Sequence, residues 1–129
     1  MEHQITFLYK TYENWRETSV ISKEITERLE SLLNTAHAPY SNYPVSSVVV
    51  LESGEMIEGT NQENAAFPSG LCAERVAVLA AKAAHPHEAI QTVYIMTGES
   101  EREPAAPCGS CRQVLHETEL RQTKPFELI

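Results

Sequence analysis

Two short stretches decide the fold and contain every cysteine of the chain: Leu71-Cys72-Ala73-Glu74-Arg75 and Pro107-Cys108-Gly109-Ser110-Cys111-Arg112. Three thiolates can bind one Zn²⁺ and leave its fourth tetrahedral position for water, which is the arrangement of a catalytic rather than a structural site. Glu74 lies two residues from the first cysteine, close enough to exchange protons with that water without being a ligand. The pattern therefore predicts a zinc hydrolytic site, with Cys72, Cys108 and Cys111 as ligands and Glu74 as the proton shuttle.

Each stretch alone also has a plainer interpretation. A single Cys-x-x-Cys occurs in structural zinc sites and in redox pairs, and a Cys-x-Glu can be a buried cysteine beside a surface glutamate. The conjunction of the two, each at a predicted helix start after a loop, favours catalytic zinc, because helix N-termini favour the thiolate. We hypothesise that Arg75 and Arg112 offset the negative charge of the site by donating to the sulfurs; the alternative is that both are ordinary surface arginines.

Length and composition limit the class of protein. The chain has 129 residues, enough for one domain, and its hydrophobic fraction of 42% fits a globular protein. Eighteen acidic against ten basic residues give a net charge of −8, which disfavours binding to a polynucleotide. No apolar run has the length of a membrane span, and the first residues lack the layout of a secretory signal. We therefore expect a cytoplasmic protein that binds neither nucleic acid nor membrane.

Hydrophobic periodicity predicts an alternation of helices and strands. Apolar residues recur at helical spacing from Ile21 to Leu33, with Ser22 as a candidate N-cap, and Pro39 ends this first helix. The order helix, strand, strand, helix, strand, helix, strand predicts an α/β fold with a mixed sheet, and parallel pairing in its second half. The remaining predicted elements are the strands 45–51, 56–61, 90–96 and 124–129 and the helices 72–84 and 108–119.

The first twenty residues have no clear period. Ile5, Phe7 and Tyr9 lie at strand spacing, which suggests a short edge strand, and a loosely packed extension is the alternative. We expect residues 1–20 to form a terminal extension of a single domain that covers residues 1–129. In that extension Trp15 is expected to be a packing anchor.

Taken together, these motifs resemble the cytidine deaminases of the free-nucleoside type, specifically their small three-cysteine class. The resemblance runs from about residue 36 to residue 126. It rests on four stretches: Ala38-Pro39-Tyr40-Ser41-Asn42-Tyr43, Asn61-Gln62-Glu63-Asn64-Ala65-Ala66, Cys72-Ala73-Glu74-Arg75 and Pro107-Cys108-Gly109-Ser110-Cys111-Arg112-Gln113-Val114-Leu115. The resemblance implies a three-layer α/β/α sandwich, a Zn²⁺ cofactor, and a homotetramer, with a dimer as the alternative. It also implies hydrolytic deamination of cytidine and deoxycytidine to uridine and deoxyuridine, with release of ammonia, in pyrimidine salvage.

The same resemblance implies a substrate site. Asn61 and Glu63 are similar to the pair that hydrogen-bonds the ribose 3′-hydroxyl, and the backbone of Ala73 would contact the base. Tyr43 and Phe67 would form aromatic walls. A capped strand end is the plainer interpretation of Asn61 and Glu63.

Three features depart from the family pattern. Val45-Ser46-Ser47-Val48 stands where the family has Val-Gly-Ala-Ala, and two buried hydroxyls need partners or cost stability. Tyr43 replaces the usual Phe. The sequence ends at Ile129, where family members continue with a strand, a loop and a C-terminal helix, so we expect the usual C-terminal part to be missing and substrate closure to be weakened.

Other functions remain open at this stage. One is a zinc deaminase for another small aminated nucleoside, and another is an inactive, truncated zinc-bound protein with a binding or structural role. Editing of nucleic acid is a further alternative, against which the net charge of −8 argues. Activity that requires Glu74 while zinc is retained would distinguish the enzyme from the binding protein.

Overall fold

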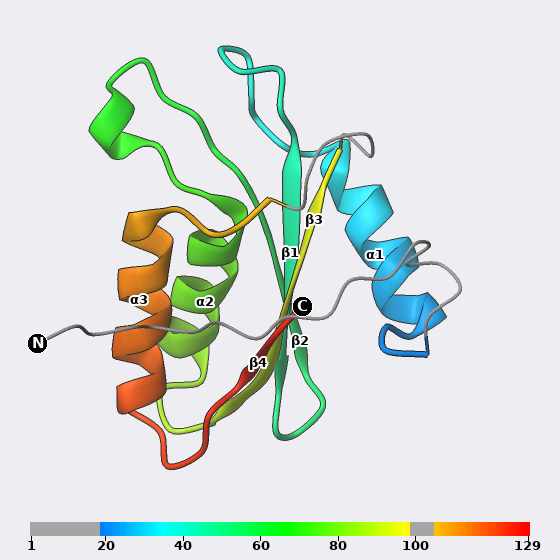
Figure 1. Ribbon diagram of the computed structural model, residues 1–129, viewed down its shortest axis with the longest axis vertical. Coiled ribbons are helices and arrows are strands. Elements are labelled where there is room, and N and C mark those ends of the chain that lie inside the picture. Colours follow the sequence, from blue (N-terminus) through cyan, green and yellow to red (C-terminus); the bar gives the residue numbers. More distant parts are fainter. Residues whose placement is uncertain (1–18, 99–104) are drawn as a thin grey trace, which may run out of the picture.

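One mixed sheet with helices on both of its faces makes up the fold (Figure 1). The structure is a computed structural model, and it describes residues 19–98 and 105–129. The expectations for the first eighteen residues, and for residues 99–104 of the loop after the third strand, lie outside these ranges. The elements in chain order are α1 (Lys23–Leu33), β1 (Val45–Leu51), β2 (Met56–Thr60), the 3₁₀ turn η2 (Phe67–Ser69), α2 (Ala73–Ala84), β3 (Ile90–Thr97), α3 (Gly109–Leu120) and β4 (Glu127–Leu128).

The order of strands in the sheet is β2-β1-β3-β4. β1 pairs antiparallel with both β2 and β3, so β2 and β3 run in the same direction on either side of it. β3 and β4 pair in parallel, which confirms the predicted mixed sheet and the parallel pairing in the second half. Because α2 follows β2 and α3 follows β3, both helices begin at the same edge of the sheet (Figure 1).

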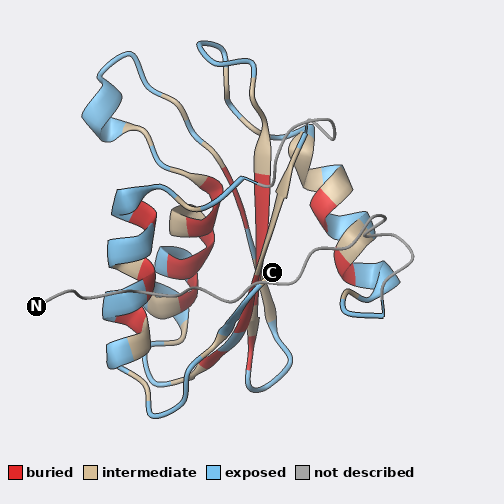
Figure 2. Cartoon of the chain, viewed as in Figure 1, coloured by how far each residue is buried: buried red, intermediate tan, exposed pale blue. Residues whose placement is uncertain are grey.

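Three layers follow from the alternation of side chains along β1. Val48 packs with Ile25 and Leu29 of α1, whereas the next residue, Val49, packs with Val78 of α2 on the other face. Figure 2 shows that the buried residues line both interfaces between the helices and the sheet. α1 therefore covers one face while α2 and α3 cover the other, which confirms the predicted α/β/α architecture (Figure 1).

Local signals predicted several element boundaries correctly. Ser22 is the N-cap of α1, and its hydroxyl accepts a hydrogen bond from the N–H of Ile25 at 3.3 Å. The strand predicted over residues 45–51 is β1 without change. The last strand is shorter than predicted: β4 covers only Glu127–Leu128, because Pro125 has no N–H to contribute to a ladder.

The two serines of β1 are fully buried, and both hydroxyls have partners. Ser46 Oγ donates to the carbonyl of Leu29 in α1, and Ser47 Oγ donates to the carbonyl of Tyr94 in β3, each at 2.8 Å. A buried hydroxyl without a partner would cost about 1–3 kcal/mol. The sequence Val45-Ser46-Ser47-Val48 is therefore accommodated, and Ser46 ties α1 to the sheet.

Gly59 in β2 sets the distance between the sheet and α2. A Cβ atom at this position would lie 2.6 Å from both the carbonyl oxygen of Ala73 and the backbone nitrogen of Ala77. The first turn of α2 can lie this close to β2 only because residue 59 has no side chain. Within the described residues, no helix is both long and apolar enough to cross a membrane.

Candidate metal centre and active site

The three cysteines meet at the edge of the sheet where α2 and α3 begin. Cys72 is the N-cap of α2, Cys108 is the N-cap of α3, and Cys111 lies in the first turn of α3. The Sγ atoms of Cys72 and Cys108 are 3.9 Å apart, and those of Cys108 and Cys111 are 3.3 Å apart. All three sulfurs lie within 4.8 Å of one another. The structure thus brings together the three residues that the sequence selected as ligands.

The cluster fits a zinc ion. Four-coordinate zinc with Zn–S bonds of about 2.3 Å places its sulfurs about 3.8 Å apart. The 3.9 Å separation of Cys72 and Cys108 matches this value, whereas the 3.3 Å separation of Cys108 and Cys111 is shorter. Soft thiolate donors in this number select zinc over hard cations such as Mg²⁺ or Ca²⁺.

The two thiols of the Cys-x-x-Cys motif differ in burial and in the direction of their pKa shifts. Cys108 is exposed, and its Sγ accepts a hydrogen bond from the N–H of Cys111 at 3.4 Å, which lowers the pKa of the Cys108 thiol. Cys111 is buried, and its burial, together with the neighbouring Glu74 carboxylate, raises the pKa of its thiol. A bound divalent cation reverses the second effect, because a coordinating thiol is deprotonated.

Glu74 lies at the cluster and is buried. It follows Ala73 in the first turn of α2, and its residue is only 4% exposed. Its carboxylate is close enough to Cys111 to interact with the thiol. The sequence predicted this carboxylate beside the three cysteines, and in the structure it is buried next to Cys111.

The two arginines beside the motifs have different partners. Arg75 Nη2 donates to Cys72 Sγ at 3.6 Å and to the carbonyl of Gly70 at 3.3 Å, and the bond to Cys72 is the main cause of its raised pKa. Its Nε is buried and has no hydrogen-bond partner among the described residues. Arg112 Nε instead donates to the carbonyl of Pro107 at 2.9 Å. Arg75 contacts a sulfur directly, and the bond of Arg112 holds the backbone before Cys108.

Asn61 and Glu63 follow β2 at the same edge, and both bind the loop that precedes β1. Asn61 Oδ1 accepts from the N–H of Val45 and Nδ2 donates to the carbonyl of Tyr43, both at 2.9 Å. Glu63 Oε2 accepts from the N–H groups of Tyr40 at 2.8 Å and Ser41 at 3.3 Å. The Ser41 hydroxyl also bonds the Glu63 carboxylate and is the largest cause of the lowered pKa of Glu63, followed by the bond from the N–H of Tyr40.

The other three predicted substrate contacts lie in different environments. Ala73 is fully buried at the start of α2, and Tyr43 is half-buried in the loop before β1. Phe67 is 91% exposed at the tip of a loop that the backbone pairing of Gln62 with Leu71 closes at its base (Figure 1). Phe67 is therefore not packed against the described residues around the cysteine cluster.

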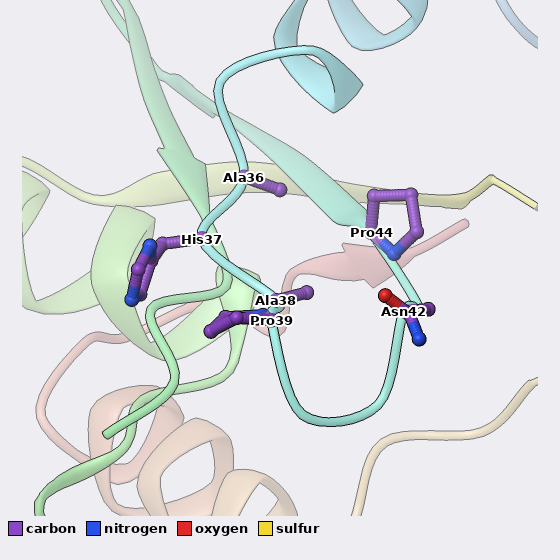
Figure 3. A pocket seen from close by; sticks show the side chains of 6 residues that line it. All are labelled: Ala36, His37, Ala38, Pro39, Asn42 and Pro44. Carbon is purple, nitrogen blue, oxygen red and sulfur yellow. The ribbon is translucent and has the colours of Figure 1, made fainter. Parts of the chain in front are cut away.

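A hollow of about 430 Å³ lies against the loop before β1 (Figure 3). Its lining residues are Ala36, His37, Ala38, Pro39, Asn42 and Pro44, and none of the cysteines contributes to it. The chemistry of the cluster, rather than the size of this hollow, therefore identifies the candidate site.

The comparisons with known proteins agree with this geometry. Residues 21–125 match the family model of the cytidine and deoxycytidylate deaminase zinc-binding region. The chain belongs to this family. The cysteine cluster is the part of the described chain that suits the zinc of this family.

Individual relatives have similar sequences and folds. The chain is 33% identical over 102 residues to a cytidine deaminase of Mycoplasma genitalium, covering 79% of this chain and 76% of the relative. It is 32% identical over 91 residues to a cytidine deaminase of Halalkalibacterium halodurans, covering 70% and 67%. The crystal structure of cytidine deaminase from Burkholderia pseudomallei superposes with a TM-score of 0.64 at 36% identity, covering 74% of this chain and 75% of that one.

Sequence reasoning assigned no role to Ser41. Its hydroxyl contacts the Glu63 carboxylate and also accepts from the N–H of Tyr43 at 3.1 Å. A serine two residues before an aromatic residue in a turn-rich stretch is a signal for this type of bond, since serine hydroxyls in turns commonly bind the backbone two residues on. The partner Glu63 could not be found in this way, because it is far along the chain.

Proposed function

We propose that this protein hydrolytically deaminates cytidine and deoxycytidine to uridine and deoxyuridine, with release of ammonia. The observation that carries the proposal is the meeting of three cysteine sulfurs with the buried Glu74 carboxylate at two helix N-termini, in a member of the deaminase family. The cytidine deaminases among its relatives support the choice of substrate.

Cys72, Cys108 and Cys111 would hold the metal. When bound there, Zn²⁺ supplies Lewis-acid activation of a water molecule. The three thiolates leave the centre with a net charge of −1, and the Arg75 guanidinium, which donates to Cys72 Sγ, offsets it. Arg112 would act on the same centre only indirectly, by fixing the carbonyl of Pro107 before the Cys-x-x-Cys.

Glu74 would carry the protons of the reaction. Its carboxylate takes one proton from the water whose oxygen bonds to C4, and delivers this proton to the ring nitrogen N3 of the base. The same carboxylate then takes the second proton from the hydroxyl now carried by C4 and passes it to the exocyclic amine. The C4–N bond breaks, ammonia leaves and the C4 oxygen becomes the carbonyl of uridine; the amine is a poor leaving group until it is protonated.

The remaining predicted residues would bind and orient the nucleoside. The backbone of Ala73 would contact the base, Asn61 and Glu63 the ribose 3′-hydroxyl, and Tyr43 a face of the substrate. The side chains of Asn61 and Glu63 can each make hydrogen bonds beyond the contacts described above. A site that hydrogen-bonds a hydroxyl of its substrate discriminates against nucleosides that lack it.

We also propose a homotetramer in which the exposed Phe67 completes the site of a neighbouring copy. Phe67 is 91% exposed at the tip of a closed loop, so the described residues of its own chain do not bury it, and burial against a second copy would stabilise it. Sedimentation velocity of the protein and of Phe67→Ser tests this. A monomeric or dimeric wild-type protein contradicts the tetramer, and an unchanged assembly of the variant contradicts the role of Phe67.

Loss of the ultraviolet absorbance of cytidine, measured with ammonia release, tests the reaction. We expect turnover by the zinc-loaded protein, loss of turnover in a chelator, and recovery on adding zinc. Glu74→Gln should abolish turnover and keep stoichiometric zinc. Turnover by Glu74→Gln at the wild-type rate would exclude the proton shuttle, and a zinc-loaded wild-type protein without turnover would exclude the deaminase.

A matched pair of variants tests the arginines. Arg75→Gln should weaken zinc binding, because it removes a charge-assisted bond to a ligand, and Arg112→Gln should weaken it less. Competition with a chromophoric chelator measures both affinities. Equal affinities of Arg75→Gln and the wild-type protein would remove Arg75 from the metal centre.

A further inference from the structure

Both backbone polar groups of Tyr43 are held by side chains. Its N–H donates to Ser41 Oγ at 3.1 Å, and its carbonyl accepts from Asn61 Nδ2 at 2.9 Å. The same Asn61 amide accepts from the N–H of Val45 at 2.9 Å, so it joins the two residues that flank Pro44. One side chain at the end of β2 therefore fixes the last turn of the loop before β1.

Glu63 holds the first half of the same loop. Its Oε2 accepts from the N–H groups of Tyr40 at 2.8 Å and Ser41 at 3.3 Å. The hydroxyl of Ser41 also interacts with this carboxylate, while its oxygen accepts from Tyr43. Ser41 thereby links Glu63 to Tyr43, and both of the predicted ribose-binding residues converge on the backbone of one aromatic residue.

The loop depends on these side chains, because it has little regular structure of its own. Asn42 has a φ of 53°, in the left-handed region that residues other than glycine rarely adopt. The loop contains Pro39 and Pro44, neither of which has an N–H, and it has one backbone bond of its own, from Asn42 to Ala38. Asn61 and Glu63 hold the N–H groups of Tyr40, Ser41 and Val45, so these amides would open more readily without the two side chains.

We infer that Asn61 and Glu63 are positioning residues: they hold the loop 38–45, and with it the Tyr43 side chain, in the conformation that forms one wall of the substrate site. This inference rests on the proposed function and adds to it, because a direct bond to the sugar accounts for none of the four loop contacts. Ser41 belongs to the same hydrogen-bond network, although it is not itself a proposed sugar contact. Loss of any of the three residues releases Tyr43 whether or not the substrate carries a 3′-hydroxyl.

Paired substrates separate positioning from direct contact. We would measure kcat and KM of the wild-type protein, Asn61→Ala and Ser41→Ala with cytidine and with 3′-deoxycytidine. If Asn61 acted only by binding the 3′-hydroxyl, its removal would weaken the reaction of cytidine and leave that of 3′-deoxycytidine unchanged. Positioning predicts that both variants raise KM by a similar factor for the two substrates, roughly two- to tenfold for Ser41→Ala.

The chain offers a matched control in Ser53. Its hydroxyl accepts from the N–H of Glu55 at 3.2 Å, and it contacts the Glu88 carboxylate just as Ser41 contacts Glu63. Ser53 lies in the turn between β1 and β2, away from the cysteine cluster. Ser53→Ala should therefore lower stability about as much as Ser41→Ala and leave KM unchanged for both substrates.

Hydrogen exchange gives a readout that needs no turnover. The amides of Tyr40, Ser41, Tyr43 and Val45 should exchange faster in Asn61→Ala and Ser41→Ala, and those of β3 should not. The inference is overturned if the loss caused by Asn61→Ala is confined to cytidine, if Ser41→Ala and Ser53→Ala have the same KM, or if exchange in the loop is unchanged. A wild-type protein that fails to deaminate cytidine while its variants show faster exchange instead contradicts the proposed function alone.

Discussion

Replacing Gly59 by alanine should damage the metal centre from a distance, although residue 59 is not a ligand. The added Cβ would lie 2.6 Å from the carbonyl oxygen of Ala73 and from the backbone nitrogen of Ala77, and 3.0 Å from the Cα of Ala77. All three atoms belong to the backbone of α2, so no side-chain rotation can relieve the contacts. The helix must move away from β2 until the shortest contact reaches at least 3.0 Å, the lower limit for real Cβ atoms.

That movement is large on the scale of metal coordination. A shift of about 0.4 Å at Ala73 displaces Cys72, its neighbour in the chain, whereas metal–ligand distances must agree within about 0.2 Å. We expect Gly59→Ala to lower the free energy of unfolding by about 1–3 kcal/mol through overpacking. We also expect the dissociation constant of zinc to rise about 10- to 100-fold, as it does when the support of a ligand is lost.

Urea unfolding and competition with a chromophoric zinc chelator measure these two effects separately. Gly109→Ala is the matched control, because Gly109 lies next to Cys108 at the start of α3 and a Cβ there meets nothing within 4 Å. We expect this control to keep its zinc affinity and its stability, since alanine is the better helix former. Wild-type stability and zinc affinity in Gly59→Ala would refute the claim that residue 59 positions α2.

Two further predictions follow from single contacts, and a third concerns the metal. Ser46→Ala should lower the free energy of unfolding, measured in urea, by about 1 kcal/mol, because the carbonyl of Leu29 in α1 loses the hydrogen bond from the Ser46 hydroxyl. An unchanged free energy of unfolding would mean that Ser46 does not tie α1 to the sheet. Ser41→Ala should raise the pKa of Glu63 toward its ordinary value in a ¹³C NMR titration, because the Ser41 hydroxyl is the largest cause of its lowering. A carboxyl group whose pKa is lowered in the folded protein stabilises the fold at pH values above its ordinary pKa. This stabilisation is lost as the pH falls through the pKa of the folded state. The free energy of unfolding of the wild-type protein should therefore fall more steeply on acidification than that of Ser41→Ala. Lowering free zinc with a chelator should lower the free energy of unfolding by about 1.4 kcal/mol for each tenfold decrease, as long as free zinc stays well above its dissociation constant. Independence of free zinc over that range would place the metal outside the folded site.

The parts of the fold that the sequence predicted well are those that local chemistry determines. Ser22 is the N-cap of α1 because a short hydroxyl side chain can bind the N–H three residues ahead, and such a signal needs only adjacent residues. The run of β-branched residues after Val45 fits a strand that is buried on both faces, and β1 has the predicted bounds. The cysteine motifs were recognisable for a similar reason, since Cys72 and Cys108 are N-caps of their helices.

The contacts that the sequence did not predict join residues far apart in the chain. Ser46 and Ser47 look unfavourable in a buried strand until the carbonyls of Leu29 and Tyr94 are placed against them. In the sequence, Gly59 is only a glycine that weakens a strand. The need for a residue without a side chain at this position is seen only when the backbone of α2 lies against it. Register and packing distance decide these cases, and neither can be obtained from the periodicity of one segment.

One edge of the sheet explains why the separate motifs form one site. β2 and β3 both run toward this edge, since each is antiparallel to β1, and the helix that follows each strand begins there. Asn61 comes directly after β2, and Val45 begins β1, which runs the other way, so these two residues also meet at this edge. The N-termini of α2 and α3 bring the cysteines to the same edge, where Asn61 and Glu63 hold the loop before β1. Strand direction therefore unites the cysteine cluster, the proposed proton carrier and the proposed substrate wall, and a change that reverses or shifts β1 should disable all three together.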